Sequence, residues 1–571
     1  MRISPKDPNE SLLSVAGWLR TSCDSLRCRR ELNGSSRLGL AHMETRAANA
    51  ERAGLFRAAS PQQVLRNLLW HRPDAPGACY HELQKVQRVD VFISHPNSSP
   101  RLLKALSICH HFNLDAAIAS FILTWLLAVA AMLLRCGSWV ALLEAPVPLL
   151  FLTCMCPPTA AFLLVLFGGH LLQTTIWFDR LCVSQETPFS KLQTLQSIPA
   201  FVASSREMLV LWDANLFQRL WCNYELAVFA KTSVSTQAMH FMPLWVPLWT
   251  LASFGIFFLQ VAVLFLVPQG AQPTIDADSR LELFWSIFNA SQSYVVVFVV
   301  GGFPLSWFCL QKVRNHRSML DGMALFDVRD AKCSLETDRV TIERHVLELF
   351  DEAMEAPLSV SFGAQEDEAS DVQEALISRE ALESIRNVTS YPSKDEILDE
   401  FNAYVRGPLR DSVMHRLGSE EEISFKLCLI GILPLLFASP FQCCTNRDCQ
   451  ATATHMGIQS VGWFVVANVS LTLLFALLAS TTVFPMLLRA NAFITSNLAH
   501  SAWQLLLVLL TGLVLELLVG SWASFVSSLG WVVAAKWSPK WFLGLVGCLC
   551  LVSLQFWLLF FKPRKAKKPS T

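Results

Sequence analysis

Four polar side chains that could bind or transform a ligand stand where the chain leaves short apolar runs. Ser94 and His95 end one such run, Asp179 follows a second, and Glu225 lies on a predicted helix after a third. In an open parallel sheet, ligands bind in the crevice beyond the carboxyl ends of the strands. The sequence therefore predicts a site in which a hydroxyl, an imidazole and two carboxyl groups face one crevice.

The elements that would position these side chains alternate between strands and helices. Apolar runs at 89–95, 176–178 and 208–212 predict three strands, while 192–205 and 219–226 predict helices. Alternation at this spacing favours parallel strand pairing. We therefore expect an α/β domain with a flavodoxin-like parallel sheet, in which the first two strands pair although a long segment separates them.

The composition of the 571-residue chain is that of an integral membrane protein. Hydrophobic residues make up 53% of it and charged residues only 16%, with a mean hydropathy of +0.39, whereas soluble domains are richer in charge. The formal net charge is zero, so no nucleic-acid partner is expected. Residues 1–20 lack the pattern of a cleaved signal peptide. The 17 cysteines contain no C-x-x-C pair, which disfavours a zinc ribbon or a disulfide framework.

Eight apolar runs are long enough to cross a hydrocarbon core about 30 Å thick. They lie at 114–134, 148–172, 244–267, 294–310, 423–441, 461–488, 501–526 and 541–561. The first two form a hairpin between the first and second strands, so the chain returns to the side from which it started. Basic residues follow the fourth run and fill the C-terminal tail, which places both termini in the cytosol by the positive-inside rule. We expect an all-α transmembrane bundle of about eight helices.

The predicted order of segments follows from these runs. It comprises a polar, largely disordered region 1–88, an α/β domain split into 89–113 and 175–243, a transmembrane hairpin 114–172, a second hairpin 244–310, a cytosolic amphipathic-helical region 311–422, four transmembrane helices 423–561 and a basic tail 562–571. Within 311–422, Ser393 and Glu396 have the spacing of a capping box, and Ile342 and Val346 lie on one face of another predicted helix.

Four stretches of the α/β region follow one another in a distinctive order: VDVFISH at 89–95, WFD at 177–179, the stretch 198–212, and WCNYEL at 221–226. They resemble the Toll/interleukin-receptor (TIR) domain family, with its D-V-F-I-S-[HY] strand, its second strand, its I-x-x-S stretch before a third strand, and its W-C-x-x-E-L motif. The segment 177–185 is also similar to the W-I-D-x-L-C-I-N-Q stretch of heterokaryon-incompatibility domains.

The resemblance implies a catalytic role for Glu225, because in enzymatic family members the glutamate of W-C-x-x-E assists cleavage of the nicotinamide–ribose bond of NAD. A carboxylate can stabilise the oxocarbenium-like sugar that forms as nicotinamide leaves. Ser94, His95 and Asp179 would then bind the substrate, and Trp221 could stack against a base. The alternatives are a surface carboxylate at Glu225 and a core position for Trp221.

Cys222 lies inside the same W-C-x-x-E motif and invites a comparison with catalytic thiols. A thiolate nucleophile needs a neighbouring base, and the sequence offers none that can be named. Free cysteine usually packs as a small hydrophobe. We therefore expect Cys222 to lie in the core.

Glu516 lies inside the predicted span 501–526, where ionisable groups are costly and often functional. It could mark an ion or proton path, with Gln504 or Asn468 nearby. The alternative is a protonated glutamate that bonds to a neighbouring helix.

Three cysteines cluster in the loop that this topology places on the non-cytosolic side: Cys443, Cys444 and Cys449. Two of them could form a disulfide in an oxidising compartment. No cluster with the spacing of metal ligands is apparent, so no metal site is predicted.

Together these features predict a membrane-anchored, TIR-like signalling protein. It would act through self-association of its cytosolic α/β domain or through other TIR-like domains, with the lipid bilayer as its second partner. No bound cofactor is expected, and NAD is a possible substrate of an NAD nucleosidase activity. Two other classes stay open: a non-enzymatic membrane scaffold or receptor, and a channel or transporter that the α/β domain regulates.

Overall fold

The computed structural model describes most of the chain. It covers residues 51–70, 80–168, 174–184, 187–213, 215–232, 238–266, 279–333, 336–350, 393–441, 448–498 and 502–560. The predicted disorder of residues 1–50, the cysteines at 443 and 444, and the basic tail lie outside these residues.

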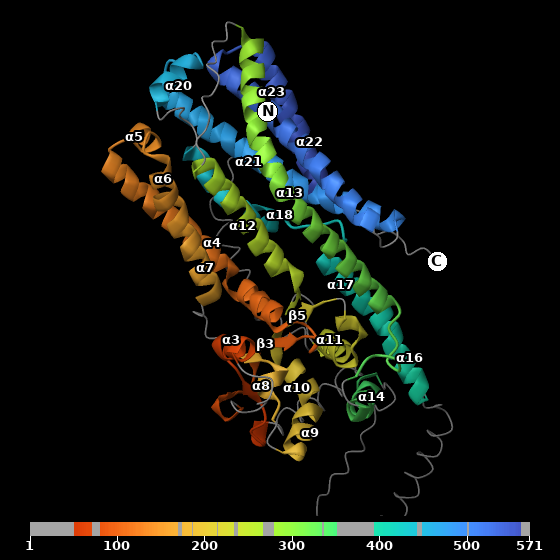
Figure 1. Cartoon of the computed structure of the whole chain (residues 1–571). Coiled ribbons are helices and arrows are strands. Elements are labelled where there is room, and N and C mark those ends of the chain that lie inside the picture. The colour runs from red at the N-terminus through yellow and green to blue at the C-terminus, as the bar shows by residue number, and fades with distance from the viewer. Residues whose placement is uncertain are drawn as a thin grey trace, which may run out of the picture. The chain divides into compact units, whose positions relative to one another are not determined.

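The chain divides into two compact units, each assembled from three stretches of sequence (Figure 1). Unit 1 comprises 1–98, 173–241 and 319–416, and unit 2 comprises 99–172, 242–318 and 417–571. Unit 1 contains a small sheet with flanking helices, and unit 2 is helical.

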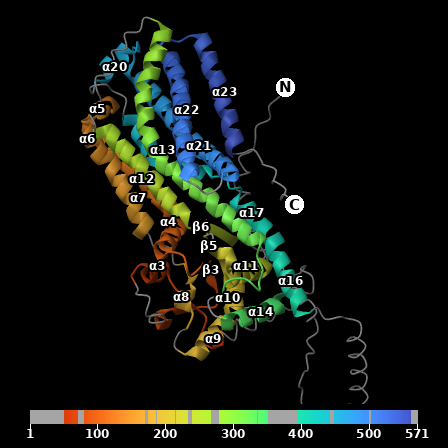
Figure 2. The same cartoon turned by 45° about the vertical axis from the view of Figure 1, so that its right-hand side comes forward.

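The sheet of unit 1 has four strands in the order β4-β3-β5-β6. These strands are β3 (Val89–Ser94), β4 (Ile176–Trp177), β5 (Ser205–Trp212) and β6 (Met239–Pro243). Strand β3 runs parallel to both of its neighbours, and Figure 2 labels β3, β5 and β6 close together. In chain order the strands are second, first, third and fourth, which is the order of a flavodoxin-like sheet.

The pairing of β3 with β4 confirms the predicted adjacency of these two strands. Val91 lies opposite Ile176 and Phe92 opposite Trp177, and the rings of Phe92 and Trp177 stack at 4.5 Å. The carboxylate of Asp90 accepts hydrogen bonds from the backbone N–H and hydroxyl of Thr175, at 2.9 and 2.8 Å. The register is therefore fixed by the hydrogen bonds between Asp90 and Thr175 at one end and by the stacked rings of Phe92 and Trp177.

Residues of the predicted polar N-terminal region also belong to unit 1. Helix α3 (Pro61–Trp70) starts at a proline, which suits the first position of a helix, and buries Val64, Leu65 and Leu68. A two-stranded ribbon joins β1 (Arg57–Ala58) to β2 (Gln84–Lys85). These strands are too short to leave a periodic signal in the sequence.

Further helices of unit 1 lie between its strands and after the last strand in the sequence. They are α8 (Asp179–Cys182), α9 (Pro188–Gln196), α10 (Ile198–Ala203), α11 (Leu220–Thr232), α14 (Glu336–Phe350), α16 (Lys394–Tyr404) and α17 (Arg410–Leu417). The predicted capping box of α16 is confirmed, because Ser393 and Glu396 bond reciprocally to each other's backbone N–H. Ile342 and Val346 of α14 are fully buried, as their periodicity predicts.

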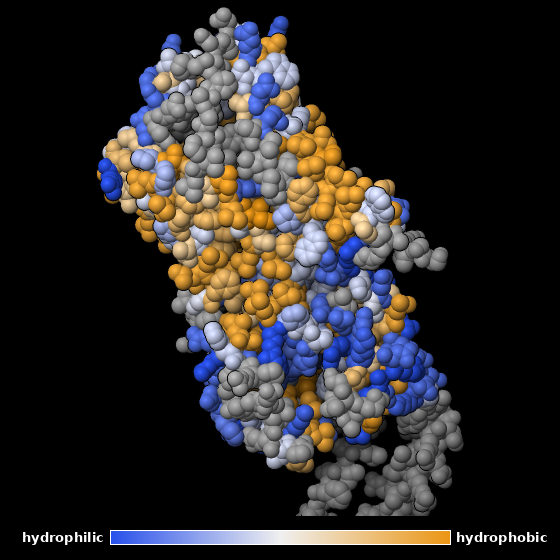
Figure 3. Space-filling model, viewed as in Figure 1, coloured by the Kyte–Doolittle hydropathy of each residue, from blue (hydrophilic) through white to orange (hydrophobic). Residues whose placement is uncertain are grey.

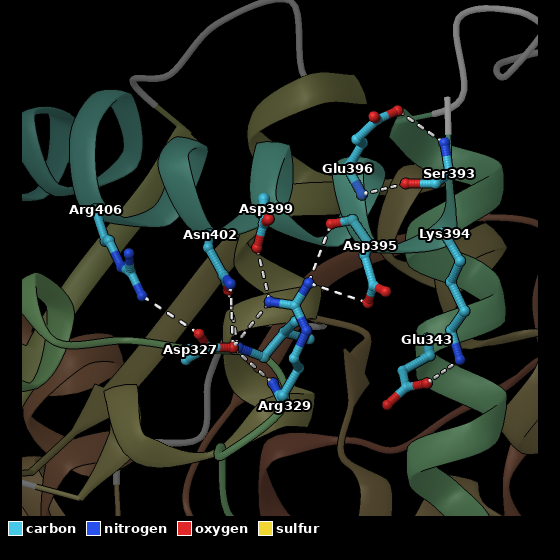
Figure 4. Close-up of polar contacts among 11 residues, drawn as sticks. Asp327, Arg329, Glu343, Ser393, Lys394, Asp395, Glu396, Asp399, Asn402 and Arg406 are labelled. Atoms are coloured by element: carbon cyan, nitrogen blue, oxygen red, sulfur yellow. Dashed lines mark hydrogen bonds and ion pairs between the residues drawn. The ribbon is translucent and has the colours of Figure 1, made fainter. Parts of the chain in front are cut away.

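An ion-pair network fastens α16 to the loop that precedes α14 (Figure 4). The guanidinium of Arg329 donates to Asp399 at 2.7 Å and to Asp395 at 3.3 Å. Asn402 donates to Asp327 at 3.1 Å and accepts from the N–H of Val328 at 2.8 Å. Since every charge in the network has a partner within unit 1, we assign it a structural role.

Unit 2 consists of long apolar helices. The longest are α4 (Arg101–Cys136), α7 (Cys156–Gly168), α12 (Trp245–Leu266), α13 (Arg280–Ala324), α21 (Val461–Asn497), α22 (Ala502–Ala535) and α23 (Pro539–Phe560). Helix α4 packs along α7, and α22 packs along both α21 and α23. Large apolar side chains such as Leu127, Leu164 and Leu543 are exposed on these helices, and Figure 3 shows broad apolar areas over them.

Six helical segments of the described chain are long and apolar enough to cross a membrane. They are Arg101–Cys136, Val147–Gly168, Trp245–Val263, Val461–Asn497, Ala502–Ala535 and Pro539–Phe560. The chain is thus a multi-pass membrane protein by length and composition of its helices. The other two predicted spans fall within α13 and within the broken segment of α18 (Phe425–Gly431) and α19 (Leu433–Ala438).

Candidate functional site

Ser94 and Glu225 meet at the carboxyl end of β3. The hydroxyl of Ser94, the last residue of the strand, donates to Oε2 of Glu225 on α11 at 2.6 Å. Both residues are buried, with 1% of Ser94 and 9% of Glu225 exposed. The first and last motifs of the α/β region are therefore in direct contact, although the chain separates them by 131 positions.

His95 and Asp179 form a second pair next to the first. Nε2 of His95 lies 2.9 Å from Oδ1 of Asp179, and the imidazole stacks on the ring of Phe178 at 4.7 Å. The side chain of His95 is 1% exposed and that of Asp179 is 33% exposed. Asp179 is thus the most accessible member of the group.

Helix α11 holds Glu225 in place through contacts at its first turn. The side-chain amide of Asn223 donates to the carbonyls of Phe217 and Arg219, at 2.9 and 2.8 Å. The backbone of Lys332 accepts from the N–H of Leu220 at 3.1 Å and donates to the carbonyl of residue 218 at 2.7 Å. The segment before α14 therefore fixes the start of the helix that carries the glutamate.

Burial raises the pKa of Glu225 to about 8. The hydrogen bond from Ser94 and the charge of Arg219 lower it, while the charge of Asp179 raises it further. A buried carboxyl group loses the hydration that stabilises its charged form. Glu225 is therefore mostly protonated at neutral pH and ionises on the alkaline side.

Cys222 lies in the core beside the site, as expected. Its thiol points to the carbonyl of His95 at 3.7 Å, and burial raises its pKa far above the usual range of a thiol. A thiol that stays protonated is a poor nucleophile, so Cys222 fills space at this point.

The structure brings four of the five predicted site residues of unit 1 together. Ser94, His95, Asp179 and Glu225 form the cluster just described, which we call the β3-end cluster. Trp221 is half-buried, and its ring lies edge-on to Tyr224 with 6.4 Å between centroids. Sequence reasoning missed the support from Asn223 and Lys332, because backbone carbonyl contacts of this kind have no motif.

The candidates of unit 2 lie on its long helices. Glu516 is buried on α22, and Asn468 is buried on α21. Gln504, proposed as a neighbour of Glu516, instead accepts from Arg314 at 2.5 Å and donates to the carbonyl of Leu498. Twelve residues of helix correspond to about 18 Å, so Gln504 lies at a different level of α22 from Glu516.

Cys449 is disulfide-bonded, whereas the other described cysteines are free thiols. Its partner therefore lies outside the described residues. Among the described residues, no group of three or more histidine, cysteine, aspartate or glutamate side chains could hold a metal ion.

Comparisons with protein-family models, curated proteins and solved structures find no match to this chain. Its class is therefore defined by what the structure contains: a small parallel α/β unit with a polar cluster at one strand end, and a helical unit of membrane type.

Proposed function

We propose that unit 1 is a TIR-like α/β domain that signals by self-association and cleaves NAD at Glu225, within a multi-pass membrane protein. The observation that carries the proposal is the contact between Ser94 and Glu225. It joins the two most specific motifs of the resemblance at the carboxyl end of the central strand. The strand order supports the same fold, because it is that of the flavodoxin-like sheets.

The β3-end cluster lies where flavodoxin-like sheets bind ligands. The chain leaves β3 toward β4 on one side, whereas β5 lies on the other side. Ligands of doubly wound sheets bind at this topological switch point, outside the carboxyl ends of the strands. Ser94 and His95 follow directly from β3, and Glu225 comes from the helix after β5.

The proposed reaction breaks the bond between nicotinamide and C1′ of the ribose. The bond electrons leave with nicotinamide, water adds its oxygen to C1′, and one proton is released, so NAD and water give ADP-ribose, nicotinamide and a proton. Ionised Glu225 stabilises the positive sugar. Because Ser94 covers this carboxyl group in the described state, the ribose must displace that hydroxyl before the reaction.

The test is NAD turnover by the full chain in lipid nanodiscs, with nicotinamide release as the readout. We expect Glu225→Gln to lower turnover about 100-fold or more. Glu207→Gln is the matched control, because Glu207 is an exposed carboxylate on β5. Turnover should rise about tenfold between pH 7 and pH 9, as a group with a pKa of about 8 ionises. Turnover by Glu225→Gln equal to that of the unmodified chain overturns the proposal.

An exposed apolar pair on α9 supports self-association as the output of unit 1. Phe189 is 74% exposed, and Leu192 is also exposed. Helix α9 follows β4, in the region that mediates assembly in the TIR family. We expect Phe189→Ser to weaken self-association in detergent, measured by sedimentation. Leu325→Ser, at another exposed leucine of unit 1, should leave it unchanged; the same weakening in both variants would contradict a role for α9.

Contacts within unit 2 support eight membrane crossings. One set of contacts involves Asp115–Lys426, Arg317–Glu420, Arg314–Gln504 and Arg489–Leu558. A second set involves Glu144–Cys449, Arg280–Trp537 and Trp463–Ala534. Six of the eight segments run from a residue of one set to a residue of the other: α4, α13, the α18–α19 segment, α21, α22 and α23. The segments Val147–Gly168 and Trp245–Val263 are counted as crossings by their length and hydropathy. By this criterion α13 and the broken α18–α19 segment are crossings in addition to the six helices found by hydropathy.

The disulfide at Cys449 supports an orientation for the bundle. Disulfides persist in oxidising compartments, so the end of unit 2 that contains Glu144 and Cys449 is non-cytosolic and both termini are cytosolic. An impermeant maleimide should label Gln459→Cys on intact cells and label Glu400→Cys only after permeabilisation. The reverse pattern would refute this orientation without bearing on NAD cleavage.

A further inference from the structure

Helices α13 and α22 of unit 2 run antiparallel along a continuous seam. Ser521 donates to Gln292 at 3.1 Å, and Arg314 donates to Gln504 at 2.5 Å. Between these polar ends, Leu310 and Val508 belong to one apolar cluster. As the residue number rises along α13, the number of the partner residue on α22 falls, as expected for two antiparallel helices.

Small residues let the two helices approach closely at the centre of the seam. A Cβ added at Gly302 would overlap the carboxyl group of Glu516, and one added at Gly512 would overlap the hydroxyl of Ser306. Gly302 and Ser306 are one turn apart on α13, as are Glu516 and Gly512 on α22. The carboxyl group of Glu516 therefore lies directly against the backbone of α13.

Three buried oxygens near this point lack a hydrogen-bond partner in the part of the chain that the structure describes. They are Oε2 of Glu516, Oγ of Ser306 and Oδ1 of Asn491. Asn491 on α21 donates through Nδ2 to the carbonyl of Ser306 at 3.1 Å, which brings α21 into the same region. Glu516 is 7% exposed, and Ser306 and Asn491 are fully buried.

Pro304 deprives one backbone carbonyl of α13 of its usual helical donor. It lies inside α13, and proline has no N–H to donate to the carbonyl four residues earlier. That carbonyl belongs to Val300, two residues from Gly302. The centre of the seam therefore combines the acceptor oxygens of Glu516 and Asn491 with the hydroxyl of Ser306, which can donate only one hydrogen bond. A proton on the carboxyl group would supply a second donor.

The cations of the surrounding helices are engaged away from Glu516. Arg314, twelve residues and about 18 Å along α13 from Gly302, bonds to Gln504. Lys312 donates to the carbonyls of Glu420 and Glu422, and Arg489 donates to the carbonyl of Leu558. The thiol of Cys309 is in electrostatic range of Glu516. The remaining ionisable residues of α13 and α23 are Arg280, Glu282, Tyr294, His316, Arg317, Asp321, Lys540, Cys548 and Cys550.

We propose that Glu516 is a proton-binding site inside the membrane bundle, with Ser306 and Asn491 as its polar surroundings. A bare carboxylate in this environment would lack both hydration and a paired cation, which is strongly unfavourable. A bound proton neutralises it and provides a donor to the neighbouring acceptors. The inference is independent of NAD cleavage by unit 1.

The test is labelling of the full chain in lipid nanodiscs with dicyclohexylcarbodiimide, which reacts with protonated carboxyl groups in apolar surroundings. Mass spectrometry would quantify the adduct at residue 516. A solvated glutamate loses its protonated form roughly 80-fold between about pH 5 and about pH 7. We expect the adduct on Glu516 to change less than about threefold over this range, and Glu516→Gln to abolish it.

Two further measurements keep the proposal falsifiable if Glu516→Gln fails to fold. Sodium chloride in place of choline chloride should leave labelling of the unmodified chain unchanged; protection by sodium would identify a metal cation as the ligand and overturn the proposal. The infrared band of a protonated carboxylic acid should persist at neutral pH in the Glu225→Gln variant, in which Glu225 cannot contribute to it, and absence of the band from that variant would overturn the proposal. Labelling that falls as for a solvated glutamate would likewise overturn the proposal.

Discussion

The two units each bury one glutamate, and the surroundings of the two carboxyl groups differ. Glu225 in unit 1 accepts a hydrogen bond from Ser94 at 2.6 Å. Glu516 in unit 2 rests against Gly302, and its Oε2 lacks a partner in the described part of the chain. A donor stabilises the charged form of a carboxyl group, whereas burial without a donor favours the neutral form. Unit 1 therefore supplies a donor to its glutamate, whereas in unit 2 the proposed bound proton neutralises the carboxyl group.

The largest effect that would sharpen this comparison is the pH dependence of the stability of unit 1. Below about pH 4.5, Glu225 is protonated in both the folded and the unfolded chain. As pH rises toward its folded pKa of about 8, the unfolded chain loses this proton and the folded chain keeps it, so stability falls. The shift corresponds to a loss of up to about 5 kcal/mol.

Pulse proteolysis of the solubilised full chain, followed by antibodies to unit 1, measures this loss. We expect Glu225→Gln to remove that part of the decline which lies between pH 4.5 and pH 8. Glu207→Gln should retain the full decline, because that carboxylate is exposed. Identical pH profiles for all three proteins would show that Glu225 has an ordinary pKa.

A second, smaller effect concerns the close approach at Glu516. Gly302→Ala places a methyl group where the carboxyl group lies, so the helices must separate or the side chain must move. Overpacking of this kind costs about 1–3 kcal/mol. Gly255→Ala on α12 is the matched control, because an added Cβ there meets nothing within 4 Å. Thermal inactivation in nanodiscs should separate the two variants; equal stability would mean that α13 and α22 are not in close contact at this point.

The smallest effect concerns the hydrogen bond that Ser94 donates to Glu225. Ser94→Ala removes the hydrogen bond to Glu225, worth about 1 kcal/mol, and should raise the pKa of Glu225 above its present value of about 8. The rise of NAD turnover with pH should then move to higher pH by roughly one unit. Ser205→Ala, which removes a hydroxyl bonded to the carbonyl of Phe201, should leave the profile in place. An unchanged profile in Ser94→Ala would argue against Glu225 as the titrating group.

Much of the sheet could be predicted because its signals are local. The central strand β3 is a nearly continuous apolar run, as expected for a parallel strand buried on both faces, and it ends in the polar Ser94. The same kind of local signal predicted the capping box at Ser393. The positions of Ser94 and Asp179 at strand ends were enough to predict that they belong to one cluster.

The features that the sequence does not predict depend on contacts that leave no pattern in the sequence. The backbone bonds between Lys332 and the start of α11 involve only N–H and C=O groups, which every residue carries. The exposed pair on α9 is likewise visible only in three dimensions. In unit 2, Gly302 and Pro304 interrupt an apolar run in the sequence, yet only the structure places Glu516 opposite them. A hydropathy pattern identifies a membrane span but does not indicate which neighbouring helix the span contacts.

The backbone bonds between Lys332 and the start of α11 form late in synthesis. Strand β3 leaves the ribosome long before the residues that complete its unit, with 243 positions between Val89 and Lys332. At typical translation rates the nascent strand waits roughly 10–50 s for that last connection. The edges of β3 stay unpaired until β4 and β5 emerge, and α11 lacks its bonds to Lys332 until the end of this interval. The yield of mature protein should therefore depend on how fast the ribosome moves through the intervening codons.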